Sequence, residues 1–152
     1  MLSSRAKYAT RAVLHLSTRD NDQPVAIQEI AEAQNVPLKY LQQILAALKV
    51  AGFVQSRKGP GGGYALARPA REITLGDVLR AMDGPLAPIA CLSDSKNAEC
   101  GCPNPDACAL RESFRDVSTA MAKILDATTF ADLAERQKTA ENSLLGVQDF
   151  VI

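Results

Sequence analysis

Residues 37–66 read PLKYLQQILAALKVAGFVQSRKGPGGGYAL, and this stretch decides the fold of the 152-residue chain. Its apolar residues first recur every three or four positions, which predicts a helix from about Pro37 to Ala51. Two short runs of alternating polarity follow at 53–57 and 64–67, on either side of a Gly/Pro-rich tip. They predict a β-hairpin with a long connecting loop.

Two shorter amphipathic patterns precede this stretch and predict two more helices. Apolar residues recur at helical spacing over 4–18, and Ile27 and Ile30 repeat the pattern over 26–34. Three helices followed by a hairpin is the element order of a winged helix-turn-helix. In that architecture the third helix enters the major groove of DNA and the hairpin, or wing, lies along the backbone or minor groove. We therefore predict a mainly α fold with a winged helix-turn-helix head and a two-stranded wing.

The polar face of the third helix and the tip of the wing carry the residue types that DNA contacts need. A glutamine amide can read an adenine edge, and a lysine can reach a guanine edge or a phosphate. The glycines of the wing let its backbone and its two cations approach a phosphate closely. An ordinary solvated helix face is the alternative for the helix, and a nucleotide-binding loop is disfavoured because the glycine run lacks Gly-Lys-Ser/Thr and leads into a strand. The predicted DNA contacts are Lys39, Tyr40, Gln42, Gln43, Arg57, Lys58 and Gly59.

Charge is distributed unevenly, although 17 Lys and Arg balance 17 Asp and Glu. Residues 1–72 carry ten Lys or Arg against five Asp or Glu, whereas residues 73–152 carry seven against twelve. The basic N-terminal half favours a polyanionic partner. The longest apolar run, Ile44 to Leu48, is too short for a membrane helix, and the N-terminus has no apolar signal core. We expect a cytoplasmic protein that does not bind membranes.

All four cysteines, Cys91, Cys100, Cys102 and Cys108, lie in or next to the aperiodic segment 84–107, which also holds four of the eight prolines. Their spacings are C-x8-C, C-x-C and C-x5-C. Disulfides are not expected in a reducing cytosol, and zinc sites usually present C-x2-C or C-x4-C pairs. Soft thiolates on a long loop suit an iron–sulfur cluster. The cluster is the favoured interpretation, with zinc and metal-free thiol chemistry as alternatives. The one histidine, His15, is interpreted as a packed helix residue rather than a ligand.

The segment after the cysteines has a heptad pattern and predicts a long dimerisation helix. A second copy would bury this apolar seam, and a twofold dimer would place two recognition helices on a pseudo-palindromic operator. Packing within a single domain is the alternative. A short helix from Thr74 to Met82 and a last helix from Thr129 to about Asn142 complete the prediction. The seam residues are Leu110, Phe114, Val117, Met121 and Ile124.

The predicted organisation has four parts. They are a winged helix-turn-helix domain at 1–82, a cysteine-rich cluster-binding loop at 83–108, a dimerisation helix and a C-terminal helix at 109–142, and a tail at 143–152.

Residues 37–43 and 57–64 resemble the winged-helix iron–sulfur cluster regulators of the IscR/NsrR type, and the resemblance covers roughly residues 1–137. It implies a dimeric transcription regulator whose long helix pairs across the twofold axis. It also implies a 2Fe–2S or 4Fe–4S cluster on the cysteine loop, and the family's three cysteine ligands map onto Cys91, Cys102 and Cys108.

The resemblance leaves the fourth cluster ligand open. Arg111 stands where the assembly-regulator members carry a histidine ligand, and Lys7 stands where the nitric-oxide sensors carry an aspartate. Cys100 is additional to the three-cysteine pattern. We therefore hypothesise that Cys100 completes an all-cysteine site.

Taken together, these patterns predict a homodimeric DNA-binding transcriptional regulator. We expect its DNA affinity to be controlled by a cysteine-ligated iron–sulfur cluster, with 2Fe–2S favoured, that senses iron–sulfur status, redox state or nitric oxide. The alternative is a cluster-free repressor whose cysteines sense oxidants as thiols. A small electron carrier or thiol oxidoreductase is a remote alternative, because the sequence has no Cys-x-x-Cys redox pair, nucleophile–base pair or cofactor fingerprint. We do not expect an enzyme.

Overall fold

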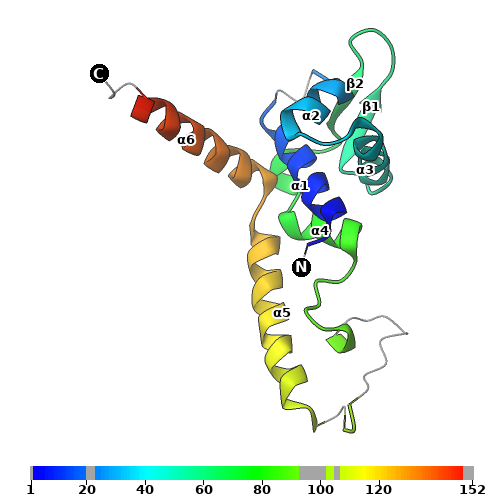
Figure 1. The fold of residues 1–152 in the computed structure, drawn as a ribbon, viewed down its shortest axis with the longest axis vertical. Coiled ribbons are helices and arrows are strands. Elements are labelled where there is room, and N and C mark those ends of the chain that lie inside the picture. Colours follow the sequence, from blue (N-terminus) through cyan, green and yellow to red (C-terminus); the bar gives the residue numbers. More distant parts are fainter. Residues whose placement is uncertain (1, 20–22, 93–101, 105–106, 149–152) are drawn as a thin grey trace.

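The computed structural model describes residues 2–19, 23–92, 102–104 and 107–148. A helical head with a β-hairpin occupies one end of the molecule, and two long helices extend from it in different directions (Figure 1). The elements of the head are α1 (Ser4–Ser17), α2 (Ile27–Gln34), α3 (Leu38–Val50), β1 (Val54–Arg57), β2 (Gly63–Leu66), the 3-10 turn η1 (Ala70–Glu72) and α4 (Leu75–Asp83). A second 3-10 turn, η2 (Ala90–Leu92), and the helices α5 (Ala109–Ala127) and α6 (Phe130–Gln148) follow.

The core of the head forms where α1, α3 and α4 meet. Small residues on the buried face of α1, including Ala6, Ala9 and Ala12, allow neighbouring helices to approach closely. The apolar residues that recur at helical spacing along α3 include Leu41, Ile44, Leu45 and Leu48, and these four are buried. Leu38, which begins the same apolar stripe, is 38% exposed because the first turn of α3 lies at the edge of the core.

Side-chain caps determine where two of these helices begin. The Ser3 hydroxyl accepts a hydrogen bond from the Ala6 amide at the start of α1. Thr74 and Asp77 form a reciprocal capping box at the start of α4, which confirms the helix predicted there. These caps satisfy amide groups that have no partner within the helix.

The wing is attached to the segment that precedes α2. β1 and β2 pair antiparallel with Val54 opposite Leu66, as the alternating pattern predicted. In addition, the amide of Val25 donates to the Tyr64 carbonyl and the amide of Tyr64 donates to the Val25 carbonyl, both at 2.8 Å. A Cβ on Gly63 would lie 2.2 Å from the Val25 carbonyl oxygen, so only glycine permits this close approach.

The ends of α5 and α6 nearest the head are fixed by backbone pairing. The Leu75 amide donates to the Thr128 carbonyl, and the Phe130 amide donates to the Ile73 carbonyl. Phe130 is fully buried against the head, whereas α6 extends away from it as far as Gln148. The predicted helix end near Asn142 was therefore wrong, and the first six residues of the predicted tail are helical. In the part of the chain that the structure describes, no helix is long and apolar enough to cross a membrane.

Candidate nucleic-acid interface and cysteine loop

The outer face of α3 is polar and open to solvent. Lys39, Gln42 and Gln43 are exposed, since they lie opposite the buried stripe of the same helix. Tyr40 is partly buried because its ring packs edge-on against Tyr8, with ring centroids 5.9 Å apart. The predicted recognition residues therefore lie together on α3, three of them fully accessible to a ligand.

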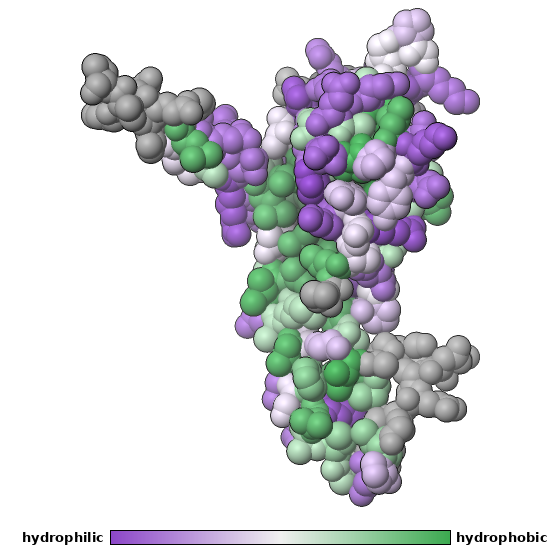
Figure 2. Space-filling model, in the orientation of Figure 1, coloured by the Kyte–Doolittle hydropathy of each residue, from purple (hydrophilic) through white to green (hydrophobic). Residues whose placement is uncertain are grey.

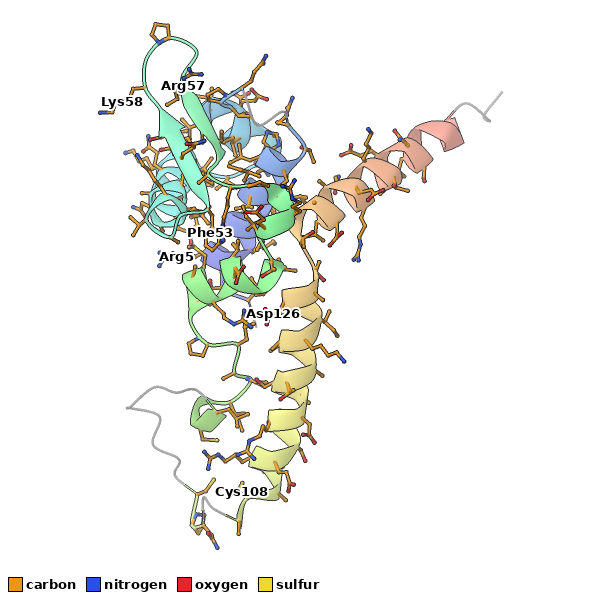
Figure 3. The ribbon with its side chains drawn as sticks, turned by 180° about the vertical axis from the view of Figure 1, so that it is seen from behind. Arg5, Phe53, Arg57, Lys58, Cys108 and Asp126 are labelled. Carbon is orange, nitrogen blue, oxygen red and sulfur yellow. The ribbon has the colours of Figure 1, made fainter. Side chains whose placement is uncertain are left out.

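The wing presents its cations at the end of the molecule farthest from α5. Arg57, Lys58 and Gly59 are all exposed, and Figure 3 shows Arg57 and Lys58 at the far end of the hairpin. Positive φ angles of 97° and 71° at Gly59 and Gly61 shape the loop, a conformation that glycine adopts without steric cost.

The base of the wing is linked to the recognition helix by one side chain. The Lys49 ammonium, in the last turn of α3, donates to the Ser56 hydroxyl of β1 at 2.6 Å. Together with the backbone bond from the Phe53 amide to the Leu48 carbonyl, this contact joins the wing to α3.

The predicted DNA-contacting cations are electrostatically available. Within the described ranges, the ion pairs are Arg19–Glu29, Arg71–Glu72 and Arg80–Asp126. None of them neutralises the cations at the polar face of α3 or at the wing tip. Exposed cations of this kind interact with phosphates and release their condensed counterions.

The cysteine loop lies at the other end of the molecule. Cys91 is in η2 and is partly buried, Cys102 is exposed, and Cys108 is the partly buried N-cap residue of α5. Figure 3 shows Cys108 at the opposite end from Arg57 and Lys58. Cys100 lies outside the described residues.

The described cysteines do not form a complete ligand set. Among the residues with described positions, no group of three or more His, Cys, Asp or Glu side chains could hold a metal ion. In its chemistry the donor set nevertheless fits an iron–sulfur cluster, because it consists of soft thiols on a loop. Arg111, one turn into α5, has no partner for its buried Nε among the described residues and cannot act as an iron ligand.

The loop is packed against α5 on its way out of the head. It begins at Gly84, directly after α4, and the Ser118 hydroxyl of α5 donates to the Leu86 carbonyl at 2.9 Å. Farther along, η2 also packs on α5. The described parts of the loop therefore lie against α5.

A bidentate ion pair joins α4 to the end of α5. The Arg80 guanidinium donates to both carboxylate oxygens of Asp126, at 2.6 and 2.7 Å. These hydrogen bonds hold the pKa of Asp126 below its usual value and raise the pKa of Arg80. A Cβ on Gly76 would overlap the Asp126 carboxylate, at 2.0 Å from its nearer oxygen, so the glycine leaves room for the pair.

The predicted seam of α5 is exposed in the single chain. Leu110, Val117 and Ile124 are 69%, 52% and 66% exposed, and Phe114 is also exposed. Met121 is partly buried and lines a groove of about 450 Å³ between α5 and the loop. Figure 2 shows the resulting apolar surface along α5, outside the mostly polar head.

A winged helix-turn-helix head with exposed cations on its recognition helix and wing defines the class of DNA-binding transcriptional regulators. Residues 2–136 match the family model Rrf2, described as "Iron-dependent Transcriptional regulator". The chain therefore belongs to the Rrf2 family, and the predicted fold and family are confirmed.

The relatives agree with this assignment. A putative HTH-type transcriptional regulator, rrf2-like, of Rhodobacter capsulatus is 36% identical, over 88% of this chain and 91% of its own length. The solved structure of CymR, the global cysteine regulator of B. subtilis, is 31% identical with a TM-score of 0.74, over 90% of this chain and 97% of that one. T. potens IscR is 28% identical with a TM-score of 0.74, over 92% of this chain and 90% of that one. The family and these relatives are transcriptional regulators, not enzymes.

Several residues that organise the interface were not predicted from the sequence. Val25 fixes the wing, Lys49 links it to α3, and Arg80 fixes α5. Of these, only Lys49 carried a sequence signal, as a cation in the last turn of a helix beside a predicted strand. The other two act through contacts between elements that are distant in sequence.

Proposed function

We propose that this Rrf2-family chain is a homodimeric DNA-binding regulator whose affinity for its operator is controlled through the cysteine loop. The observation that carries the proposal is the path of the loop, which leaves α4 of the DNA-binding head and returns as α5. A change in the loop therefore acts on the angle between the head and α5. DNA affinity responds to such a change only as far as DNA binds the two arrangements differently.

In this proposal α3 enters the major groove and the wing follows the backbone. Gln42 and Gln43 read base edges, Lys39 reaches a guanine edge or a phosphate, and Tyr40 contacts the DNA from the first turns of α3. Arg57 and Lys58 neutralise phosphates at the wing, where Gly59 allows close approach. All of these residues except the partly buried Tyr40 are exposed, and in the described part of the chain no ion pair engages the three cations, which supports these roles.

The second copy of the chain is proposed to cover the seam of α5. Three large apolar side chains there are more than half exposed, which is unusual for a monomer and costs free energy in water. A twofold dimer formed through α5 would present two recognition helices to a pseudo-palindromic operator. Because a transcriptional regulator must reach DNA, we expect the protein in the cytoplasm.

The cofactor proposed for the loop is an iron–sulfur cluster, with 2Fe–2S favoured over 4Fe–4S. Cys91, Cys102 and Cys108 would hold it, with Cys100 as the fourth ligand. The bound group would supply a redox-labile cross-link between distant parts of the loop. The chain's own contribution is to position the loop, through η2 and the bond from Ser118 to Leu86.

A cluster-free regulator that senses oxidants through its thiols is the second candidate function. It is supported by one observation, since Cys102 is exposed, where an oxidant can reach its thiol. Thiols on an accessible loop can be oxidised reversibly, which would change the loop without any metal.

The DNA-binding part is tested with the full-length chain and a pool of duplexes of random sequence. Repeated rounds of selection should enrich one pseudo-palindromic sequence, whose binding weakens steeply with added salt. No enrichment over several rounds at low salt would overturn the DNA-binding proposal.

The cofactor is tested by anaerobic purification with quantitation of iron and sulfide and a visible absorption spectrum. A brown protein with matching iron and sulfide supports the cluster. A colourless protein that binds no iron after reconstitution, but loses affinity for the selected duplex on mild oxidation, supports the thiol sensor. A Cys100→Ala variant should lose the cluster spectrum if Cys100 is the fourth ligand, and an unaltered spectrum would remove Cys100 from the ligand set.

A further inference from the structure

The middle of α1 makes an unusual set of contacts through Arg11. The Arg11 Nε donates to the Gln34 side-chain oxygen at 3.1 Å, and its terminal Nη2 donates to the Gln34 backbone carbonyl. Gln34 is the last residue of α2, where backbone carbonyls have no partner within the helix and a positive charge is favourable. Arg11 therefore caps α2 from a different helix.

The same guanidinium also reaches the recognition helix through two aromatic rings. It lies over the ring of Tyr8, 5.8 Å from the centroid. The Tyr8 ring packs edge-on against Tyr40, with an interplanar angle of 89°. Tyr40 is the third residue of α3, so these contacts connect the end of α2 to the first turn of α3.

Between these two attachment points lies the turn of the helix-turn-helix. It contains Asn35 in the left-handed conformation, with φ of 49°, and Pro37 at the N-cap of α3. Neither Pro37 nor the N-cap of α2, Ala26, makes a side-chain capping bond. The end of α2 is capped by its own backbone, since the Asn35 amide donates to the Glu32 carbonyl and the Val36 amide donates to the Ala31 carbonyl. The contacts from α1 add to this local cap and join the end of α2 to the first turn of α3.

We propose that Arg11 is a positioning residue for DNA recognition, which sets the orientation of Tyr40 and of the first turn of α3 without touching DNA. The inference rests on the proposed function, because it assumes that α3 reads base edges. Base contacts need accurate placement of side chains, whereas phosphate contacts are made by long flexible cations. Loss of the positioning contact therefore reduces sequence-specific binding much more than non-specific binding.

Arginine is required here for its shape as well as its charge. The planar guanidinium offers two donors in a fixed fork and a flat face that stacks on an aromatic ring, and a lysine ammonium offers neither. Arg11→Lys keeps the charge of the head while removing the fork and the stacking. Arg19→Lys is the matched control, since Arg19 is exposed, follows the same helix and pairs with Glu29.

The experiment measures fluorescence anisotropy of full-length protein with two probes over a range of salt. One probe is the duplex selected by the wild-type chain, and the other is poly(dI-dC). We expect Arg11→Lys to bind the selected duplex about tenfold more weakly and poly(dI-dC) within about twofold of wild type, with the salt slope unchanged. Arg19→Lys should behave as wild type on both probes.

Variants of Tyr8 provide an independent test should Arg11→Lys fail to fold. Tyr8→Phe keeps the ring and should retain wild-type affinity, whereas Tyr8→Leu should reproduce the loss on the selected duplex alone. Wild-type affinity of Arg11→Lys for the selected duplex would overturn the inference. Equal weakening on both probes would do so too, because the loss would then not be confined to sequence-specific binding. If the wild-type chain selects no duplex, it is the proposed function that fails.

Discussion

Lys58 is an exposed cation at the wing tip and takes part in none of the ion pairs of the described residues. We predict that Lys58→Ala weakens binding to all duplexes alike, because a phosphate contact carries no sequence information. The slope of log affinity against log salt should fall by about 1. Anisotropy titrations of the selected duplex and of poly(dI-dC) at several salt concentrations measure both effects.

Gln43→Ala is the matched comparison for Lys58→Ala, since it removes a neutral side chain from the exposed face of α3. It should leave the salt slope unchanged and reduce discrimination at one base position by about 1 to 3 kcal/mol. If both substitutions leave affinity and specificity unaltered, the recognition surface has been assigned to the wrong face of the head.

His15 gives the head a predicted dependence on pH. Its Nδ1 lies 3.4 Å from the Gln34 side-chain nitrogen, and its buried Nε2 has no partner among the described residues. Burial and then the charge of Arg19 lower the pKa of His15 below its ordinary value of 6.5, while Glu29 opposes them. The folded state therefore binds a proton less readily than the unfolded state.

Because the pKa of His15 is lower in the folded state, its contribution to the free energy of unfolding is fully present above about pH 6.5. This contribution is lost as the pH falls through the folded pKa. We predict a lower free energy of unfolding at about pH 5.5 than at about pH 7.5, measured by urea denaturation. His15→Gln should reduce this difference. Asp126 does not affect this comparison, because its pKa is lowered from an ordinary value of 3.8 and its protonation changes stability only at more acidic pH. An equal pH dependence in wild type and variant would contradict the prediction.

At the scale of elements, the wing depends on the pairing between β2 and the segment before α2. We predict that Gly63→Ala breaks this pairing, because the new Cβ would meet the Val25 carbonyl at 2.2 Å. The amides of Val25 and Tyr64 should lose their protection from hydrogen exchange. The free energy of unfolding should fall by about 1 to 3 kcal/mol.

Gly59→Ala is the control for the wing. Gly59 also has a positive φ, but a Cβ at this position would meet no described atom within 4 Å, so the strain stays at the wing tip. The Val25 and Tyr64 amides should keep their protection in this variant. Equal loss of protection in both variants would show that the whole wing, rather than the contact at Gly63, had been disturbed.

The sequence predicted the individual elements well because their signals are local. The helix α3, the start of α4 at Thr74 and the hairpin follow from periodicity, capping residues and turn residues. Periodicity identifies the buried face of a helix but not where the core ends along it, and Leu38 on that face is exposed. Likewise, no local pattern encodes the partner of Val25.

The candidate site could be predicted only in part. The polar face of α3 and the wing tip are exposed as expected, since an amphipathic helix and a hairpin loop fix their own outer surfaces. The ligand set of the loop stays a prediction, because closeness of cysteines in sequence does not determine their distances in space. The contacts of Arg11 were missed because its partners, Gln34 and Tyr8, lie on both sides of it in sequence and belong to two different helices.

At the scale of the whole molecule, the exposed seam of α5 should determine the assembly. We predict that Ile124→Glu, which places a charge in an apolar interface, shifts the protein towards the monomer. Sedimentation velocity at several protein concentrations measures the change. Binding to the selected duplex should weaken with it, since two half-sites need two linked heads.

Lys123→Glu tests whether the effect belongs to the seam. Lys123 is exposed on α5 next to Ile124 but outside the heptad positions, so its substitution should leave the sedimentation coefficient unchanged. If Ile124→Glu sediments as the wild type does, the seam is not the dimer interface.

The 19-residue helix α5 joins the head to the cysteine loop as one rigid element. The Arg80–Asp126 pair attaches it to the head, and Cys108 lies at its other end, about 27 Å away along the helix axis. Over this length, a tilt of about 10° at the Arg80–Asp126 pair displaces the Cys108 end by about 5 Å, because each residue adds about 1.5 Å to the helix. A shift of that size in the cysteine loop would therefore rotate the head by the same angle. In a twofold dimer the two rotations act together on recognition helices that must match the pitch of DNA, about 34 Å.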